Sequence, residues 1–356
     1  MRGVAALVVL VGHGLVGANV SWFSPLPVPR AYLAVDFFFL LSGFILARVY
    51  ERRFVEGMTA RQFMLQRYIR LYPLFLIGLT VGIVSALITN AMHRGSLPLG
   101  AIGTAATTEL FMLPSPTWHY IPHIFPLNKP GWSLFFELVA NAIYAFAWTK
   151  LSNRVLAVIV ATSGAALIYL CAHGGGYGGA GWGDFAWGFP RVCFSFFLGV
   201  LIGRCYRSRF VQSPLAALLP IALLPILFLP QMAGPVLELV IAMLVFPLIV
   251  AAGASIEPRS PRGYVFLGSI SYPLYAIHEP LLYFFWRVLV FFRFSPEQIA
   301  PASGIAFAAL VIWLSWWLER NYDIPIRGWL TGKFVKRRHR RADLSEVAVS
   351  ATSNLS

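Results

Sequence analysis

The chain has 356 residues, of which 58% are apolar and only 12% carry a charge, and its mean hydropathy is +0.71. A soluble domain is about 25% charged, because it needs a polar shell around its core. The composition excludes a soluble globular enzyme, a disordered chain and a disulfide scaffold, and it predicts an all-α polytopic membrane protein.

Ten apolar runs are each long enough, at about 20 residues, to cross a bilayer as a helix. In chain order they cover residues 3–22, 31–50, 70–90, 132–149, 155–172, 187–205, 214–230, 235–253, 265–291 and 301–320. A weaker run at 97–113 contains Glu109 and a threonine cluster, so we expect it to be re-entrant or interfacial. These runs predict a transmembrane helical bundle of about ten spans.

The basic residues predict how the bundle is oriented. The net charge is +14, and Lys and Arg alternate between segments in the way that marks cytoplasmic loops. With the N-terminus in the cytoplasm, 22 Lys and Arg fall in inside segments and 5 in outside segments. We therefore expect both termini to be cytoplasmic. The same distribution argues against a nucleic-acid-binding face, because the charge does not gather on one domain.

Residues 1–332 are predicted to form the transmembrane domain, and residues 333–356 a basic and then polar cytoplasmic tail without fixed structure. The tail begins KFVKRRHRR, for which a cytoplasmic anchor is favoured over contact with anionic lipid. Residues 91–131 and the Gly-rich 173–184 form distinctive outside loops. His119 and His123 have a spacing that suits zinc on a helix, but Pro122 lies between them, so we expect no metal site.

Ionisable side chains are costly inside a bilayer, so those within the apolar runs are candidate functional residues. A rise of 1.5 Å per residue puts His13 about 16 Å and His278 about 20 Å from the inner end of their helices. The same rise puts Asp36 and Glu137 about 8 Å from the outer end of theirs. The sequence thus predicts two histidines and two carboxylates close together in the outer half of the membrane.

Two helices are predicted to carry polar faces. Arg2 and His13 are eleven residues apart, almost three turns, so both lie on one face and can line a shaft. Ser271, Tyr275 and His278 also share a helix face, in a segment that Pro273 and Pro280 can kink. For this face, a substrate-lining role and a structural polar cluster are equally supported.

Five segments in order resemble the integral-membrane acyltransferase family, acyltransferase type 3. They are RGVAALVVLVGH (2–13), VDFFFLLSGF (35–44), FMLQRYIRLYPLF (63–75), GWSLFFE (131–137) and SYPLYAIHEPLL (271–282). The resemblance extends over residues 2–320, and the family's fold of about ten spans agrees with the number of apolar runs. Family members usually carry several residues before the first R-G, whereas this chain begins at Met1, directly before Arg2.

The resemblance implies an acyltransferase that moves an acyl group, usually acetyl, from cytoplasmic acyl-coenzyme A to a hydroxyl. The expected acceptor is an envelope carbohydrate or glycolipid, and the expected location is the bacterial inner membrane. His13 is the expected general base, with Glu137 orienting it or stabilising charge. Arg2, Arg67 and Arg70 are expected to bind the coenzyme A phosphates. An acyl-His intermediate stays open as an alternative to direct transfer.

We expect the acceptor to be bound by Asp36, Trp132, Ser133, Tyr275 and His278. Several of these residues also have structural interpretations. Asp36 can instead pair with an Arg and hold its helix in place, and Glu137 can form an interhelical hydrogen bond. Trp118, His119, Tyr120 and His123 can stack on a sugar or belong to an interfacial aromatic belt.

Two functions of other classes remain open at this point. Intramembrane histidines and carboxylates also suit a proton-coupled transporter or a lipid flippase. We find no internal repeat of the kind that many transporters show. A non-catalytic membrane scaffold is less favoured, because it would not need so many ionisable groups in its spans.

Overall fold

The computed structural model describes residues 1–16, 31–92, 95, 97–173, 178–205, 211–212, 234–257, 262–294 and 302–336. This part of the chain is helical apart from a parallel pairing of β1 (Val211–Gln212) with β2 (Ile256–Glu257). The helices are α1 (Arg2–Val16), α2 (Ala34–Val55), α3 (Ala60–Ala91), α4 (Leu99–Leu110), α5 (Gly131–Ala147), α6 (Asn153–Ala172), α7 (Gly188–Cys205), α10 (Gly234–Val240), α11 (Phe246–Ser255), α12 (Arg262–Phe291), α14 (Ala302–Leu318) and α15 (Ile324–Thr331). Short 3-10 turns precede α2 and α7 at Ala31–Leu33 and Phe185–Trp187, and π-helical turns occupy Ile241–Val245, Glu319–Asp323 and Gly332–Lys336.

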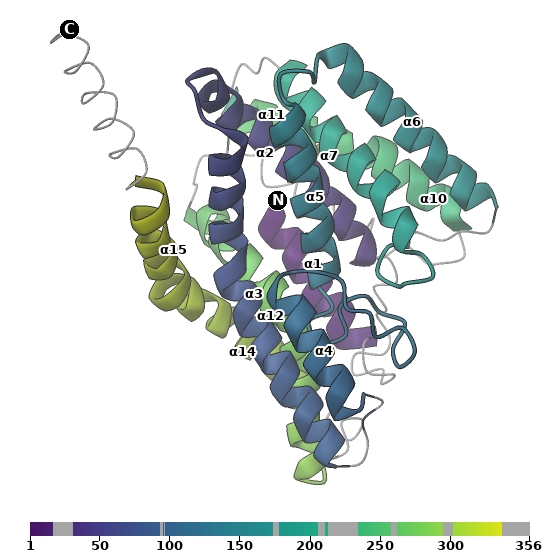
Figure 1. Ribbon diagram of the computed structural model, residues 1–356, viewed down its shortest axis with the longest axis vertical. Coiled ribbons are helices and arrows are strands. Elements are labelled where there is room, and N and C mark those ends of the chain that lie inside the picture. The colour runs from purple at the N-terminus through teal and green to yellow at the C-terminus, as the bar shows by residue number, and fades with distance from the viewer. Residues whose placement is uncertain are drawn as a thin grey trace, which may run out of the picture.

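Helix α1 lies in the middle of the bundle, and the N-terminus is enclosed by other helices (Figure 1). It packs against α2, α12 and α14. On one side α2 packs on α7, and α7 packs on α6; on the other side α3 packs on α12, α5 and α4. Helix α15 continues from α14 and lies along the flank of the bundle (Figure 1). This arrangement places the first helix where it can contribute to a buried site.

Helices α2 and α7 touch through glycines. A Cβ atom at Gly43 would lie 1.9 Å from the carbonyl oxygen of Phe196, and one at Gly199 would lie 2.1 Å from that of Leu40. Small residues allow two backbones to approach this closely. The resulting van der Waals contacts stabilise helix association, because lipid supplies no hydrophobic driving force for it. Gly43 and Gly199 are therefore the residues that allow this close contact.

A second close approach joins α3 to α12. Pro280 has no N–H with which to bond the carbonyl of Ala276 four residues earlier. That carbonyl faces Gly78 of α3, where an added Cβ would lie 2.4 Å from its oxygen. Helix α12 continues through both Pro273 and Pro280. The proline and the glycine together let α3 lie against the part of α12 that carries Tyr275 and His278.

Helix α3 begins at Ala60, ten residues before the predicted limit. The Oγ1 of Thr59 accepts a hydrogen bond from the Gln62 backbone N–H at 3.2 Å, and Gln62 Oε1 accepts one from the Thr59 N–H at 2.9 Å. This reciprocal pair is a capping box, which fixes a helix start. As a result, Arg67 and Arg70 lie inside the helix, about 10 Å or more from its first residue.

The weak run at 97–113 forms α4, a helix too short to cross a bilayer. The buried Glu109 carboxylate accepts hydrogen bonds from the backbone N–H groups of Leu127 (2.9 Å) and Asn128 (3.0 Å). These two hydrogen bonds attach the loop that follows α4 to the helix. Burial raises the pKa of Glu109 to about 8, although both backbone hydrogen bonds act in the opposite direction.

The two long loops pack against each other at this end of the bundle. The Ile124 N–H donates to Ala180 O at 2.9 Å, and the Trp182 N–H donates to Pro122 O at 2.8 Å. The Trp182 indole also donates to Ser115 O at 2.9 Å. The described end of the Gly-rich loop is thus held by backbone hydrogen bonds; residues 174–177 lie outside the described residues.

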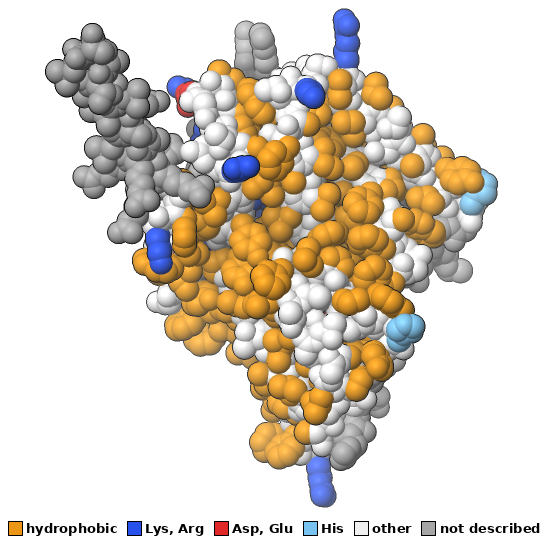
Figure 2. Space-filling model, in the orientation of Figure 1, with side chains coloured by type: hydrophobic (Ala, Val, Ile, Leu, Met, Phe, Trp, Pro, Cys, Tyr) orange, Lys and Arg blue, Asp and Glu red, His pale blue; other side chains and the backbone are white. Residues whose placement is uncertain are grey.

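Six described segments are long and apolar enough to cross a bilayer: Ala60–Ala91, Asn153–Ala172, Phe185–Cys205, Gly234–Ser255, Arg262–Phe291 and Ala302–Val335. Arg2–Gly12 and Gly131–Ala147 are shorter apolar helices. The predicted run 31–50 corresponds to α2, and the run 214–230 lies outside the described residues, so the total of about ten spans stays a prediction. Figure 2 shows apolar side chains across the middle of one face and Lys and Arg toward its ends. The helical turns reach Lys336, four residues into the predicted tail.

Candidate functional site

A small cavity lies beside α1 and is named here the Glu137 cavity. Its volume is about 20 Å³, which is room for one water molecule. It is lined by Arg2, Val35, Phe38, Phe39, Ser133, Leu134, Glu137, Ser271, Tyr272 and Tyr275. Four of the five sequence segments that carry the family resemblance contribute to this lining, so residues far apart in sequence meet around one point.

Glu137 is the centre of a buried ionic cluster. Its Oε1 accepts hydrogen bonds from Arg67 Nη2 and from Ser42 Oγ, each at 2.6 Å. The side chains of Arg67 and Glu137 are only 8% and 9% exposed. A buried ion pair of this kind needs further hydrogen bonds to offset the loss of hydration, and Ser42 supplies one. Glu137 is therefore held in a fixed orientation.

Arg2 faces the same cavity from the first turn of α1. Its Nε atom is buried and has no hydrogen-bond partner among the residues that the structure describes. Glu137 is the acidic group with which Arg2 interacts electrostatically, and Arg67 and Arg70 are the nearby cations. Arg2 and Arg67 thus both lie near the Glu137 carboxylate, which gives this region a positive potential suited to an anionic ligand.

A larger cavity, named here the Trp132 cavity, lies next to the first and has a volume of about 330 Å³. It is lined by Val9, Tyr32, Val35, His123, Lys129, Pro130, Trp132, Gly178, Ala180, Asp184, Arg191, Tyr275, His278 and Glu279. This lining combines an aromatic ring with several charged and hydrogen-bonding groups, as sites for polar small molecules do. Val35 and Tyr275 line both cavities.

Tyr275 forms the partition between the two cavities. Its hydroxyl lies 2.6 Å from Ser133 Oγ, and Ser133 Oγ also donates to Pro130 O at 3.1 Å. Because Ser133 uses its proton for Pro130, the Tyr275 hydroxyl is the donor to Ser133. The His278 Nδ1–H group donates to Tyr275 O at 2.8 Å, which leaves Nε2 as the acceptor nitrogen of the neutral ring.

Arg191 binds Asp36 on the wall of the Trp132 cavity. Two guanidinium nitrogens bond the carboxylate, with Nη2 to Oδ2 at 2.7 Å and Nε to Oδ1 at 3.0 Å. Arg191 also donates to Gly178 O at 2.8 Å, and its guanidinium lies 5.2 Å from the Trp132 ring centre. The pair is almost fully buried and joins α2 to α7. The alternative interpretation of Asp36, an ion pair that holds its helix, is therefore confirmed.

The opposite wall of the Trp132 cavity carries Lys129, whose Nζ lies 3.3 Å from Glu279 Oε1 and 2.5 Å from Tyr283 Oη. Burial acts to lower the pKa of Lys129, but Glu279 and Tyr283 outweigh it and raise that pKa. Burial also lowers the pKa of His123 to about 4, against the opposing charge of Glu279. At neutral pH this wall therefore presents a charged ammonium and a neutral imidazole.

The predicted site residues divide between the two cavities. Trp132 and His278 line the larger one, Ser133 and Glu137 the smaller one, and Tyr275 both. Glu137 was expected beside Asp36 and His278, but it lies with Arg2 and Arg67, because α3 begins early enough to carry Arg67 up to it. Arg70 is exposed. His13 lies within α1, but its side chain lies outside the described residues.

Three further residues were not among the predicted site residues. The first is Ser42, whose hydroxyl binds Glu137 at 2.6 Å. The second is Arg191: a buried arginine requires an acidic partner, and Asp36 is that partner. Lys129 lies in a Pro-rich loop, and no periodicity in the sequence marks it.

Comparison with known proteins identifies the family of this chain. A family model described as an acyltransferase domain matches residues 1–320. Protein 2 in the picA locus of Rhizobium radiobacter is 34% identical over 185 residues, which cover 49% of this chain and 92% of that protein. Acyltransferase MdmB of Streptomyces mycarofaciens is 29% identical over 164 residues, which cover 44% of this chain and 39% of MdmB. No solved structure matches significantly.

Proposed function

This chain belongs to the acyltransferase family whose model covers residues 1–320, and from that premise we propose that it acylates a carbohydrate hydroxyl across a membrane. The proposed donor is cytoplasmic acyl-coenzyme A, with acetyl as the expected acyl group. The proposed acceptor is an envelope carbohydrate or glycolipid, and the proposed location is the bacterial inner membrane. Family membership and the apolar helices together make the chain an integral membrane acyltransferase. They also favour acyl transfer over a transporter or flippase.

One observation carries the proposal: two cavities of different chemistry share Val35 and Tyr275. The Glu137 cavity is lined by Arg2 and lies beside the Arg67–Glu137 pair, and guanidinium groups suit the phosphates of coenzyme A. The Trp132 cavity offers an aromatic ring, carboxylates and hydrogen-bond donors, which suit a sugar. A donor bound beside the Glu137 cavity and an acceptor in the Trp132 cavity would meet near the shared wall, where transfer requires no long movement of either.

His13 is the proposed general base. It follows Val9 by four residues in α1, so the two positions lie on one helix face, and Val9 lines the Trp132 cavity. His13 would take the proton of the acceptor hydroxyl, whose oxygen attacks the thioester carbonyl. The carbon–sulfur bond then breaks, and the coenzyme A thiolate takes the proton from the imidazolium. Direct transfer is the simpler route, and an acyl-His intermediate is the alternative.

The other predicted residues receive roles that follow from their contacts. Arg2 and Arg70 would bind donor phosphates, while Arg67 is a positioning residue because its guanidinium already binds Glu137. Glu137 would stabilise positive charge that develops on the imidazole. On the acceptor side, Trp132 and His278 would contact the sugar directly. Asp36 would act through Arg191, whose orientation it fixes.

The test is thiol release from acetyl-coenzyme A by the purified protein. Wild type is compared with His13→Ala and with His173→Ala, a matched control at the exposed end of α6. We expect hydrolysis by wild type and by the control, a loss of about 100-fold or more in His13→Ala, and donor binding by all three. Full activity in His13→Ala would show that His13 is not the general base. Absence of donor binding by folded wild type would overturn the proposed donor.

A further inference from the structure

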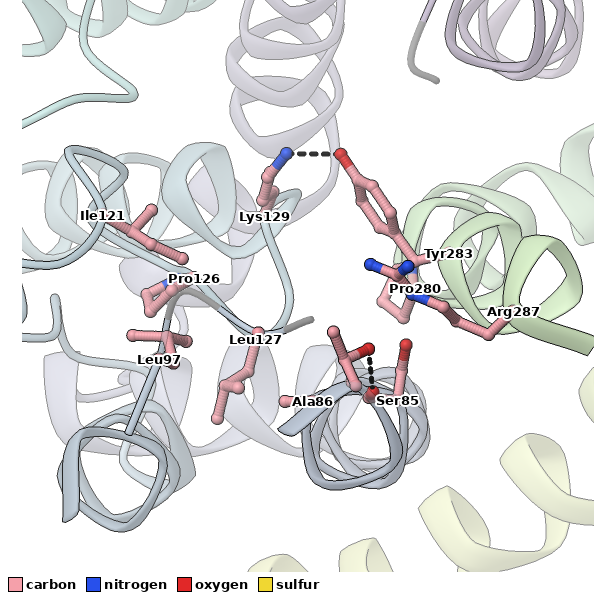
Figure 3. Close-up of a pocket in the computed structure, with 13 residues that line it drawn as sticks. Ser85, Ala86, Leu97, Ile121, Pro126, Leu127, Lys129, Pro280, Tyr283 and Arg287 are labelled. Carbon is pink, nitrogen blue, oxygen red and sulfur yellow. Dashed lines mark hydrogen bonds between the residues drawn. The ribbon is translucent and has the colours of Figure 1, made fainter. Parts of the chain in front are cut away.

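A third cavity lies between the ends of α3 and α12 and the loop that follows α4 (Figure 3). We name it the Arg287 cavity; its volume is about 210 Å³. It is lined by Gly82, Ser85, Ala86, Thr89, Gly95, Leu97, Ile121, Pro126, Leu127, Lys129, Pro280, Tyr283 and Arg287. None of these residues except Lys129 lines the Trp132 cavity, so this is a separate space with one shared wall.

The charges around this cavity leave one positive group without a counter-charge. Lys129 is already paired with Glu279 at 3.3 Å. Arg287 is half-buried, and no carboxylate of the described residues lies within ion-pair distance of it. In Figure 3 its guanidinium extends from α12 past Pro280 toward the hollow. Among the described residues, the cavity therefore has a net charge of one positive unit, which matches a monoanion.

Two hydroxyl groups add hydrogen-bond donors beside Arg287. Tyr283 Oη accepts the hydrogen bond from Lys129, so its own proton is available to a ligand. Ser85 Oγ lies on the α3 side and is directed into the hollow (Figure 3), while Thr89 is occupied by its bond to Ser85 O at 2.7 Å. A guanidinium with two neighbouring hydroxyls is a suitable donor set for phosphate oxygens.

The position of the cavity fits a lipid ligand. Arg287 lies four residues before the end of α12, so it is about 6 Å from the end of the helix. The next residues include Phe291, Phe292 and Phe294, which are 70%, 65% and 53% exposed. Exposed apolar rings at the end of a membrane helix indicate contact with lipid close to the cavity. The rest of the lining is mostly apolar and can accommodate the carbon atoms next to a phosphate.

We propose that the Arg287 cavity binds the phosphodiester of a lipid. A phosphodiester carries one negative charge, which matches Arg287, and its free oxygens match the hydroxyls of Ser85 and Tyr283. The lipid can be a bilayer phospholipid or the carrier of the sugar acceptor. In the second case, which rests on the proposed function, Lys129 lies between the phosphate and the sugar in the Trp132 cavity.

Lipid binding is tested by native mass spectrometry of the full chain in detergent, with dioleoylphosphatidylglycerol as the probe and dioleoylglycerol as its phosphate-free counterpart. The variants are Arg287→Gln, Arg287→Lys and Arg293→Gln, which removes a charge beyond the end of α12 and outside the cavity. We expect phosphatidylglycerol retention to fall about tenfold or more in Arg287→Gln, to be largely kept in Arg287→Lys and to be unchanged in Arg293→Gln.

The phosphate-free lipid should bind all variants alike, which also shows that Arg287→Gln is folded. Equal phosphatidylglycerol retention by wild type and Arg287→Gln would overturn the proposal. A second arm adds octyl glucosyl phosphodiester as a competitor. Displacement of phosphatidylglycerol assigns the cavity to a sugar carrier, and its absence assigns it to a bilayer phospholipid. Because the readout is binding, it is independent of whether acyl transfer is observed.

Discussion

The hydroxyl groups of Ser133 and Tyr275 lie 2.6 Å apart at the boundary between the Glu137 cavity and the Trp132 cavity. The two residues are 142 positions apart in sequence and belong to α5 and α12. Their hydrogen bond closes the space between the cavities from one side. It is therefore both a link between two helices and part of the surface on which donor and acceptor would meet.

The Ser133–Tyr275 bond gives the first prediction. Ser133→Ala and Tyr275→Phe each remove it without adding volume, so each should lower the melting temperature of the protein in detergent. The free energy of unfolding should fall by about 1 kcal/mol in each case. Because both variants remove the same bond, the double variant should cost less than the sum of the two. Strict additivity in thermal unfolding would show that the hydroxyls act independently.

The second prediction concerns the ion pair of Glu137 with Arg67. Glu137→Gln leaves a buried guanidinium without its counter-charge, and such a loss costs about 3–5 kcal/mol. Glu56→Gln is the matched control, because it breaks the exposed Arg52–Glu56 pair, whose loss costs less than about 1 kcal/mol. Chemical unfolding in detergent should separate the two variants clearly. Similar stability of both variants would contradict a buried ionic cluster.

The third prediction concerns the contact between α2 and α7. Gly43→Ala places a methyl group 1.9 Å from a backbone oxygen, which cannot turn aside as a side chain can. The helices must separate, so we expect a strong loss of stability or of folded yield. Gly263→Ala is the control, since nothing lies within 4 Å of a Cβ there. It should be neutral or slightly stabilising. Size-exclusion profiles and thermal unfolding measure both effects.

The fourth prediction is a pH dependence that arises from Glu109. Its folded pKa of about 8 lies above the ordinary value of 4.5. The folded state thus binds the proton more tightly, so the stabilisation is fully present below about pH 4.5 and is lost as the pH rises through about 8. The melting temperature of wild type should fall across this window.

Glu109→Gln removes the titrating group, so it should reduce this slope. The variant should also be less stable than wild type at pH 5, because an amide has one acceptor oxygen for two backbone N–H groups. Melting temperatures at five pH values between 5 and 9 provide the test. A slope unchanged by the substitution would assign the pH dependence to another group.

Much of the fold could be predicted, because helix period and hydropathy depend on local sequence. The stripe of Ser271, Tyr275 and His278 lines the cavities as its spacing predicts. The start of α3 was missed, although the sequence T-A-R-Q from Thr59 to Gln62 carries the capping-box pattern. That error in the helix start placed Arg67 too far from Glu137.

The contacts between distant residues could not be predicted in the same way. Arg191 and Asp36 are 155 positions apart, and burial alone indicates that each needs a partner without naming it. The bond of Ser42 to Glu137 also depends on how closely α2 approaches α5. Local periodicity contains no information on such distances, which follow from the glycine contacts and the packing of the whole bundle.

Helix α12 is a wall of all three cavities. It contributes Ser271 and Tyr272 to the first, His278 and Glu279 to the second, and Tyr283 and Arg287 to the third, with Tyr275 between the first two. A shift or rotation of this single helix would change all three spaces together. A ligand that favours one position of α12 would therefore change the affinity at the other two cavities, and it would be affected in return by the same factor.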